Sequence, residues 1–159
     1  MADKGVYLAP TARISLTTPE TVGLDPNSPT GKKLRQVNEG AKNQLAWARE
    51  HGVTVVFSTD QFGAPELFKE QSNEFLTLGS VFESVEVLKM ATSNVAALLE
   101  LSGELHPYRE GPLGVIRKGA YADLILVEGD PTNDVTILAD YENKIDFIMK
   151  DGVIYKDTL

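Results

Sequence analysis

The pattern of apolar and polar positions changes at Leu105: before it, helical spacing dominates between two strand-like runs, and after it, short strand-like runs follow one another. The clearest apolar run covers residues 53–60 (VTVVFSTD), a pattern typical of a parallel strand covered on both faces. In parallel α/β proteins the chemistry gathers where the carboxyl ends of strands open into loops, so Asp60 is a candidate site residue. The alternative is that the Asp60 side chain caps a following turn or helix.

The segment before this run predicts a strand, a loop and a helix. Residues 5–10 (GVYLAP) predict a short strand ended by proline, and the three prolines within residues 11–29 predict a loop. A helix should follow from Thr30 to just before Gly52. Because crossover connections favour parallel pairing, we expect residues 6–9 and 53–57 to be adjacent parallel strands. The apolar positions of this helix are Leu34, Val37, Ala41, Leu45 and Ala48.

Three more helices are predicted between Asp60 and residue 104. Residues 61–65 predict a turn, followed by a helix to about Leu78. Ser84 should cap the next helix, in which Met90 is a packing residue. Thr92 or Ser93 should cap the last helix, which Gly103 ends. The first of these helices should bury Leu67, Phe68, Phe75 and Leu78.

Short apolar runs separated by turn residues predict a small β-rich tail after Leu105. Asp151-Gly152 lies between two of the runs and predicts a hairpin, because both positions of a type I′ turn need positive φ. We expect the tail to form a sheet of its own. The predicted strands are residues 113–116, 123–127, 144–149 and 153–155.

Composition narrows the classes of function. A chain of 159 residues with 42% hydrophobic and 24% charged residues is expected to fold. A net charge of −8 argues against nucleic acid or an anionic membrane as partner. The chain has no cysteine, which excludes disulfides and thiolate metal sites. Neither a signal peptide nor a membrane span is recognisable, so we expect a cytoplasmic protein.

The chain has only two histidines, His51 at a predicted helix end and His106 before Pro107 in a predicted loop. Neither has the paired spacing of a metal site. His51 is expected to interact with the last helix carbonyls, and His106 is expected to be solvated. Because no nucleophile elbow, P-loop or dinucleotide motif is present, the residues by themselves indicate a single carboxylate, Asp60.

Four blocks of sequence together resemble the carboxyl-terminal part of the amidohydrolase superfamily. The likeness is strongest to its imidazolonepropionase-like and Xaa-Pro dipeptidase-like metal hydrolases. The most distinctive block contains Gly114, Gly119 and Asp123, and in the family it belongs to a flanking β-sandwich. The blocks are residues 52–60 (GVTVVFSTD), 91–99 (ATSNVAALL), 114–127 (GVIRKGAYADLILV) and 153–155 (VIY).

The resemblance implies a divalent metal, usually zinc, that activates water to hydrolyse an amide, lactam or peptide-like C–N bond of a small-molecule amide or dipeptide. The family binds its metal through a His-x-His pair, a carboxylated lysine or an acid, two further histidines and an aspartate after the eighth strand. Only the aspartate has a counterpart here, Asp60, which the resemblance makes both a metal ligand and the general base.

The resemblance also implies an α/β fold made of the last strands and helices of a (β/α)₈ TIM-like barrel plus part of a β-sandwich. We expect the barrel portion at residues 1–104 and the sandwich portion at residues 105–159. Since a full barrel takes about 250 residues, either the chain is a carboxyl-terminal portion, as a fragment or a truncated gene product, or a partner chain supplies the rest of the enzyme. By itself the chain should be inactive and bind zinc weakly. Open strand edges predict self-association. The alternative function is a non-catalytic αβ module that binds a partner protein.

Overall fold

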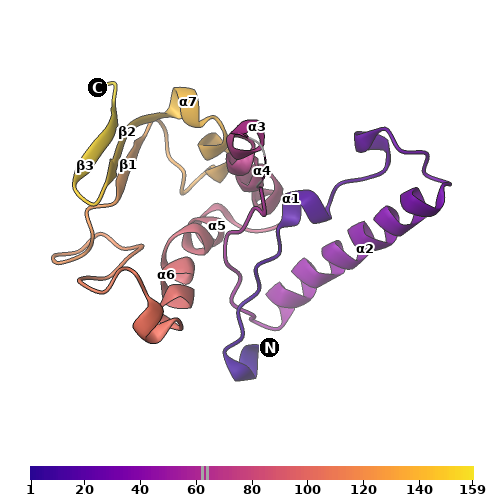
Figure 1. Cartoon of the computed structure of the whole chain (residues 1–159), viewed down its shortest axis with the longest axis horizontal. Coiled ribbons are helices and arrows are strands. Elements are labelled where there is room, and N and C mark those ends of the chain that lie inside the picture. The colour runs from indigo at the N-terminus through magenta and orange to yellow at the C-terminus, as the bar shows by residue number, and fades with distance from the viewer. Residues whose placement is uncertain (62, 64) are drawn as a thin grey trace.

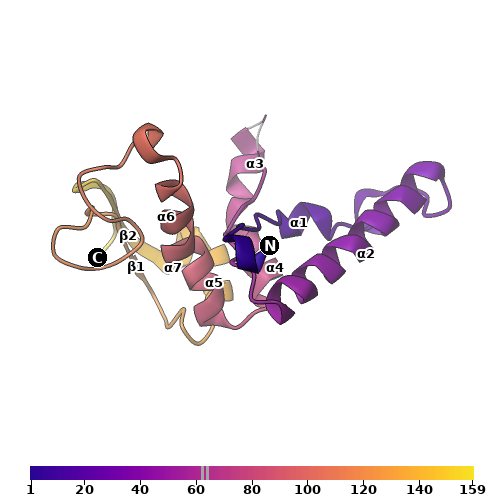
Figure 2. The same ribbon diagram turned by 90° about the horizontal axis from the view of Figure 1, so that it is seen from below.

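The computed structural model describes residues 1–61, 63 and 65–159. A long helix, α2 (Pro29–Glu50), extends from one end of the molecule, and a three-stranded sheet lies at the other end (Figures 1 and 2). Shorter helices lie between them. These are α1 (Ala12–Ser15), α3 (Pro65–Lys69), α4 (Glu74–Gly79), α5 (Ser84–Ala91), α6 (Ser93–Glu100) and α7 (Tyr141–Lys144), with 3₁₀ turns at Ala2–Lys4, Glu20–Val22, Gln71–Asn73, Gly103–Leu105 and Val135–Ala139.

The two predicted parallel segments lie side by side. Leu8 donates its N–H to the Thr54 carbonyl at 2.9 Å and accepts the Val56 N–H at 2.9 Å, which is a parallel bridge with Val55. The predicted direction is confirmed, although the pairing is a single bridge and not a regular ladder. After this bridge the second segment hydrogen-bonds to the end of helix α5, where the Phe57 N–H donates to the Met90 carbonyl at 3.0 Å.

Helix α2 forms where the sequence predicts it. Ser28 caps it by accepting the Gly31 N–H at 3.0 Å, and Gly52 follows its end with φ of 61°. The predicted buried face differs at one position, because Val37 is exposed and Asn38 is buried. The Asn38 amide donates to the Leu16 carbonyl. This hydrogen bond replaces one to water, so the polar side chain can be buried on the inner face of α2.

Two predictions for the segments around α2 are wrong. The predicted loop contains helix α1, and the single helix expected up to Leu78 is divided into α3, a 3₁₀ turn and α4. Phe68 in α3 is 52% exposed, whereas the Phe75 ring packs against Phe57 with ring centroids 4.4 Å apart. Helix α3 buries none of its described residues, whereas α4 buries Glu74 and Leu78. The predicted turn at residues 61–65 includes Phe62 and Ala64, which lie outside the described residues.

Of the caps predicted for the next two helices, Ser84 is wrong, whereas Thr92 does occupy the N-cap position of α6. Helix α5 is capped by Glu83, which forms a capping box with Glu86. The Ser84 hydroxyl instead donates to the Asn133 carbonyl and accepts the Val135 N–H, both at 3.1 Å. Thr92 precedes α6 without a side-chain cap, because its hydroxyl donates to the Leu88 carbonyl at 2.7 Å. Ser93 is the first residue of α6, which ends at Glu100.

The tail forms an antiparallel sheet of strands β1 (Leu124–Val127), β2 (Ile145–Lys150) and β3 (Val153–Asp157), in that order. The predicted hairpin between β2 and β3 is confirmed, with φ of 49° at Asp151 and 74° at Gly152. The strand predicted at residues 113–116 is not formed in the described chain. Gly114 there has φ of 67° and lies against the junction of α5 and α6.

The main hydrophobic cluster draws on both predicted portions of the chain. Leu45 of α2, Leu78 of α4 and Val87 of α5 pack in one cluster with Val135 and Leu138 of the tail. These helices and the small antiparallel sheet give an α/β fold, whereas the closed barrel and the sandwich stay predictions. None of the helices formed by the described residues combines the length and apolar character that crossing a membrane requires.

We expect Gly114→Ala to destabilise the chain by about 2–4 kcal/mol, because it combines positive φ with a steric clash. A Cβ at this position would lie 2.6 Å from the carbonyl carbon and oxygen of Thr92. Gly103→Ala is the matched control, since Gly103 has φ of 54° and no atom within 4 Å of an added Cβ. Urea unfolding of both variants measures the difference, and equal losses would contradict the close approach.

Candidate functional site

Asp60 follows the second parallel segment, at the edge where the sequence predicts chemistry. Its backbone is left-handed, with φ of 52°, and its side chain is exposed. The loop after the first parallel segment contains another such residue, Thr11, with φ of 44°. Positive φ is uncommon outside glycine, especially for a β-branched residue, and strained residues cluster at functional sites. Both loops at this edge therefore contain a residue in an uncommon backbone conformation, as functional sites often do.

Hydrogen bonds fix the two loops relative to each other and to α6. The Thr11 N–H donates to the Ser58 hydroxyl at 3.0 Å, and Ser58 lies two residues before Asp60. The Asn94 amide, in the first turn of α6, donates to the Val55 carbonyl at 2.8 Å. The segment that leads to Asp60 is therefore held from both sides. A fixed backbone of this kind is what a catalytic side chain requires for accurate placement.

Glu74 is a buried carboxylate behind the same edge, and its side chain fixes the start of α1. The residue is 1% exposed, and its two oxygens accept the N–H groups of Ala12 and Arg13, each at 2.8 Å. Burial raises the pKa of Glu74, against the opposite effect of these N–H groups and of the Arg13 charge. Glu74 is not among the residues predicted from the sequence, although its spacing of four residues from Leu78 places it on the apolar face of α4.

A cavity of about 470 Å³ lies next to these loops. Its wall includes Arg13, in the first turn of α1, and Gln61, which directly follows Asp60. The Arg13 guanidinium donates from Nη2 to Glu70 at 2.8 Å, and the Asn73 amide donates to the same carboxylate oxygen at 2.6 Å. The full lining is Arg13, Ile14, Leu16, Thr17, Thr21, Val22, Gln61 and Thr77.

The described residues do not by themselves form a metal site. No group of three or more histidine, cysteine, aspartate or glutamate side chains lies close enough together in this part of the chain to hold a metal ion. The Asp60 carboxylate can supply one oxygen ligand, whereas zinc in proteins takes three or four. Any metal at this edge would therefore need ligands from outside the described residues. The role of Asp60 as ligand and base stays a prediction.

The side chain of His106 makes structural contacts, whereas that of His51 is exposed. His106 is only 5% exposed, so the prediction that it is solvated is wrong. Its Nδ1 accepts the Tyr108 N–H at 3.1 Å, and its Nε2 lies 3.6 Å from a carboxylate oxygen of Glu100. His51 follows α2, and its side chain is exposed, while its backbone N–H donates to the Trp47 carbonyl at 3.0 Å.

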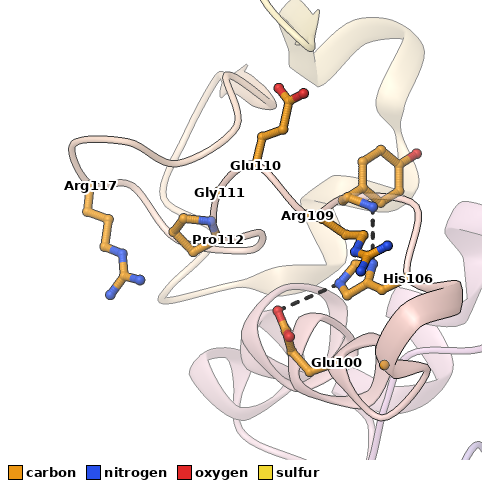
Figure 3. Close-up of a pocket in the computed structure, with 9 residues that line it drawn as sticks. Glu100, His106, Arg109, Glu110, Gly111, Pro112 and Arg117 are labelled. Atoms are coloured by element: carbon orange, nitrogen blue, oxygen red, sulfur yellow. Dashed lines mark hydrogen bonds and ion pairs between the residues drawn. The ribbon is translucent and has the colours of Figure 1, made fainter.

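A second cavity, of about 460 Å³, lies beside His106 in the connection between α6 and β1 (Figure 3). In this view Glu110 and Arg117 point away from His106, so the charged groups of the wall do not converge on one point. The Arg109 guanidinium donates to the Glu104 carbonyl at 3.2 Å within its own loop. This arrangement holds the connection in shape and offers no set of catalytic groups.

Comparisons with known proteins agree on one family. The sequence profile of the amidohydrolase family matches residues 1–156. An aminohydrolase of Methanothermobacter thermautotrophicus is 33% identical over 114 residues, which cover 66% of this chain and 27% of that protein.

Two solved structures are similar over nearly the whole chain. One is a prolidase complexed with N-methylphosphonate-L-proline, with 26% identity and a TM-score of 0.74 over 99% of this chain and 36% of that one. The other is a Xaa-Pro dipeptidase with methionine bound in the active site, with 26% identity and a TM-score of 0.75 over 98% of this chain and 36% of that one. The chain therefore spans about a third of the length of either structure.

Proposed function

This chain belongs to the amidohydrolase family, and from that premise we propose that it is the carboxyl-terminal portion of a metal-dependent hydrolase in which Asp60 is catalytic. The reaction proposed is hydrolysis of an amide, lactam or peptide-like C–N bond. The observation that carries the proposal is the placement of Asp60, exposed and left-handed where the second parallel segment ends. The alternative of a non-catalytic binding module has no observation in its favour in the described part of the chain.

In the proposed reaction a water molecule attacks the carbonyl carbon, and the Asp60 carboxylate accepts the proton that this water loses. As the C–N bond then breaks, the protonated Asp60 passes this proton to the departing nitrogen, which leaves as the amine. The carboxylate is open to solvent, so water can reach it. We propose that the site binds a divalent metal, zinc, which when bound would lower the pKa of a coordinated water molecule. Asp60 offers it one ligand oxygen, and the remaining ligands come from outside the described residues.

The substrates proposed are small amides or dipeptides. One similar structure, of a prolidase, holds a phosphonate derivative of L-proline, and another, of a Xaa-Pro dipeptidase, holds methionine. Both of these ligands are the size of one or two amino-acid residues. This similarity supports a substrate of that size for the present protein. The proposed reaction, hydrolysis of a C–N bond, is inferred from membership of the amidohydrolase family.

The test uses the complete reading frame that encodes this sequence, assayed with Xaa-Pro dipeptides and N-acyl amino acids. We expect hydrolysis that is lost after treatment with a chelator and restored by adding zinc, because the water must be activated at neutral pH. The 159-residue chain serves as the control, and we expect it to be inactive. Hydrolysis that persists in the chelator, or that occurs with the 159-residue chain, would overturn the proposal.

A further inference from the structure

The start of helix α4 contacts both loops at the edge where Asp60 lies. The buried carboxylate of Glu74 accepts the first two N–H groups of α1, each at 2.8 Å, and so fixes the loop after the first parallel segment. The next residue, Phe75, packs against Phe57 at the end of the second parallel segment, with ring centroids 4.4 Å apart. Two consecutive residues of one helix therefore support the two loops.

A single side chain joins these loops to each other. The Ser58 hydroxyl accepts the Thr11 N–H at 3.0 Å across 47 positions of sequence. Thr11 directly precedes the pair of N–H groups that Glu74 binds, so successive N–H groups of the first loop are held by side chains from two distant segments. Thr11 has φ of 44°, which a β-branched residue retains only where its surroundings hold it. The Ser58 hydroxyl is one of the groups that hold it.

Asp60 lies two residues beyond this contact, within a tight turn. The Gln61 N–H donates to the Thr59 hydroxyl at 3.5 Å, a side-chain contact that closes the turn around Asp60. The backbone of Asp60 has φ of 52°. The aspartate therefore belongs to a short closed turn, and Ser58 attaches that turn to the neighbouring loop.

We propose that Ser58 is a positioning residue for Asp60, an inference that rests on the proposed function. Its hydroxyl takes no part in the reaction and acts through the backbone, because it ties the turn around Asp60 to the loop that Glu74 holds. A general base needs an accurate position, and a displacement of about 1 Å can cost about 10²-fold in rate. Loss of the hydroxyl should therefore slow the reaction and leave the binding of substrate nearly unchanged.

Ser58→Ala, made in the protein from the complete reading frame, should lower kcat by about 10–10²-fold with little change in KM. Ser58→Thr retains a hydroxyl and should restore most of the lost rate. Ser84→Ala is the matched control, because the Ser84 hydroxyl also accepts the N–H of a distant residue, Val135, at 3.1 Å, but belongs to α5. A purely structural role would lower the stability of both alanine variants and leave kcat of the folded enzymes unchanged.

A second measurement does not depend on catalysis. NMR relaxation of the isotope-labelled 159-residue chain reports how well the Asp60 N–H is ordered. We expect an order parameter of about 0.85 in the unaltered chain and below about 0.6 in Ser58→Ala, because the turn is then no longer attached to its neighbour. Ser84→Ala should retain the value of the unaltered chain.

Full kcat in Ser58→Ala, an equal loss of kcat in Ser58→Thr or in Ser84→Ala, or an unchanged order parameter of Asp60 in Ser58→Ala would each overturn the inference. If the protein from the complete reading frame shows no hydrolysis of any substrate tested, the proposed function fails. In that case the NMR measurement alone decides whether Ser58 positions Asp60.

Discussion

Asp60→Asn should lower kcat of the protein from the complete reading frame by about 10²–10⁴-fold, the usual contribution of a general base. Asparagine has nearly the size of aspartate and also tolerates the left-handed backbone, so the fold should be retained. It cannot accept a proton from water. We expect KM to change by only a few fold, because the lost interaction belongs to the transition state. Steady-state kinetics with the best dipeptide substrate measure both constants.

This substitution also separates the two interpretations of Asp60. If its side chain only capped a turn or helix, asparagine would cap equally well and the rate would not change. Asp151→Asn is the matched control, because Asp151 is exposed and has φ of 49°, close to the 52° of Asp60, but lies in the hairpin between β2 and β3. An unchanged kcat in Asp60→Asn, or an equal loss in Asp151→Asn, would refute the catalytic role.

Glu74→Gln should reduce the free energy of unfolding by about 2–3 kcal/mol, the cost of leaving a buried polar group without its partner. The carboxylate accepts two backbone N–H groups, from Ala12 and Arg13. A glutamine side chain has only one acceptor oxygen, so its NH₂ group must face one of these donors. Urea unfolding followed by circular dichroism measures the loss.

The pH dependence of this loss has a definite sign. Burial raises the pKa of Glu74 in the folded chain above its ordinary value of 4.5. The folded state therefore binds the proton more tightly than the unfolded state, and this stabilisation is fully present below pH 4.5 and is lost as the pH rises through the folded pKa. The difference in stability between the unaltered chain and Glu74→Gln should shrink over that rise.

Glu70→Gln is the control for Glu74. Glu70 is a neighbouring glutamate, but its partners are the Arg13 and Asn73 side chains and its own side chain is 46% exposed. An exposed ion pair contributes at most about 1 kcal/mol, so this variant should lose little stability and show no comparable pH dependence. A larger loss in Glu70→Gln than in Glu74→Gln would show that Glu74 does not hold α1.

The sequence by itself determined the features that local chemistry specifies. Helix α2, capped by Ser28 and followed by Gly52, was predictable because caps and helical periodicity act within a few residues. The hairpin at Asp151-Gly152 was predictable because its turn needs positive φ at both positions. The parallel direction of the first two extended segments followed from the handedness of crossovers. The family resemblance is confirmed by the match over residues 1–156, whereas the role that it implies for Asp60 stays a prediction.

Only the tertiary structure decided which polar side chains are buried and what they bind. Glu74 reaches Ala12 across 62 positions of sequence, and Ser84 bonds to Asn133 across 49, so no local pattern could assign either contact. His106 is buried, although its position before proline in a connecting segment predicts a solvated side chain. Local patterns specify which conformations the backbone favours. The burial of a charged or polar group depends on partners from distant segments, and those partners exist only once the chain has folded.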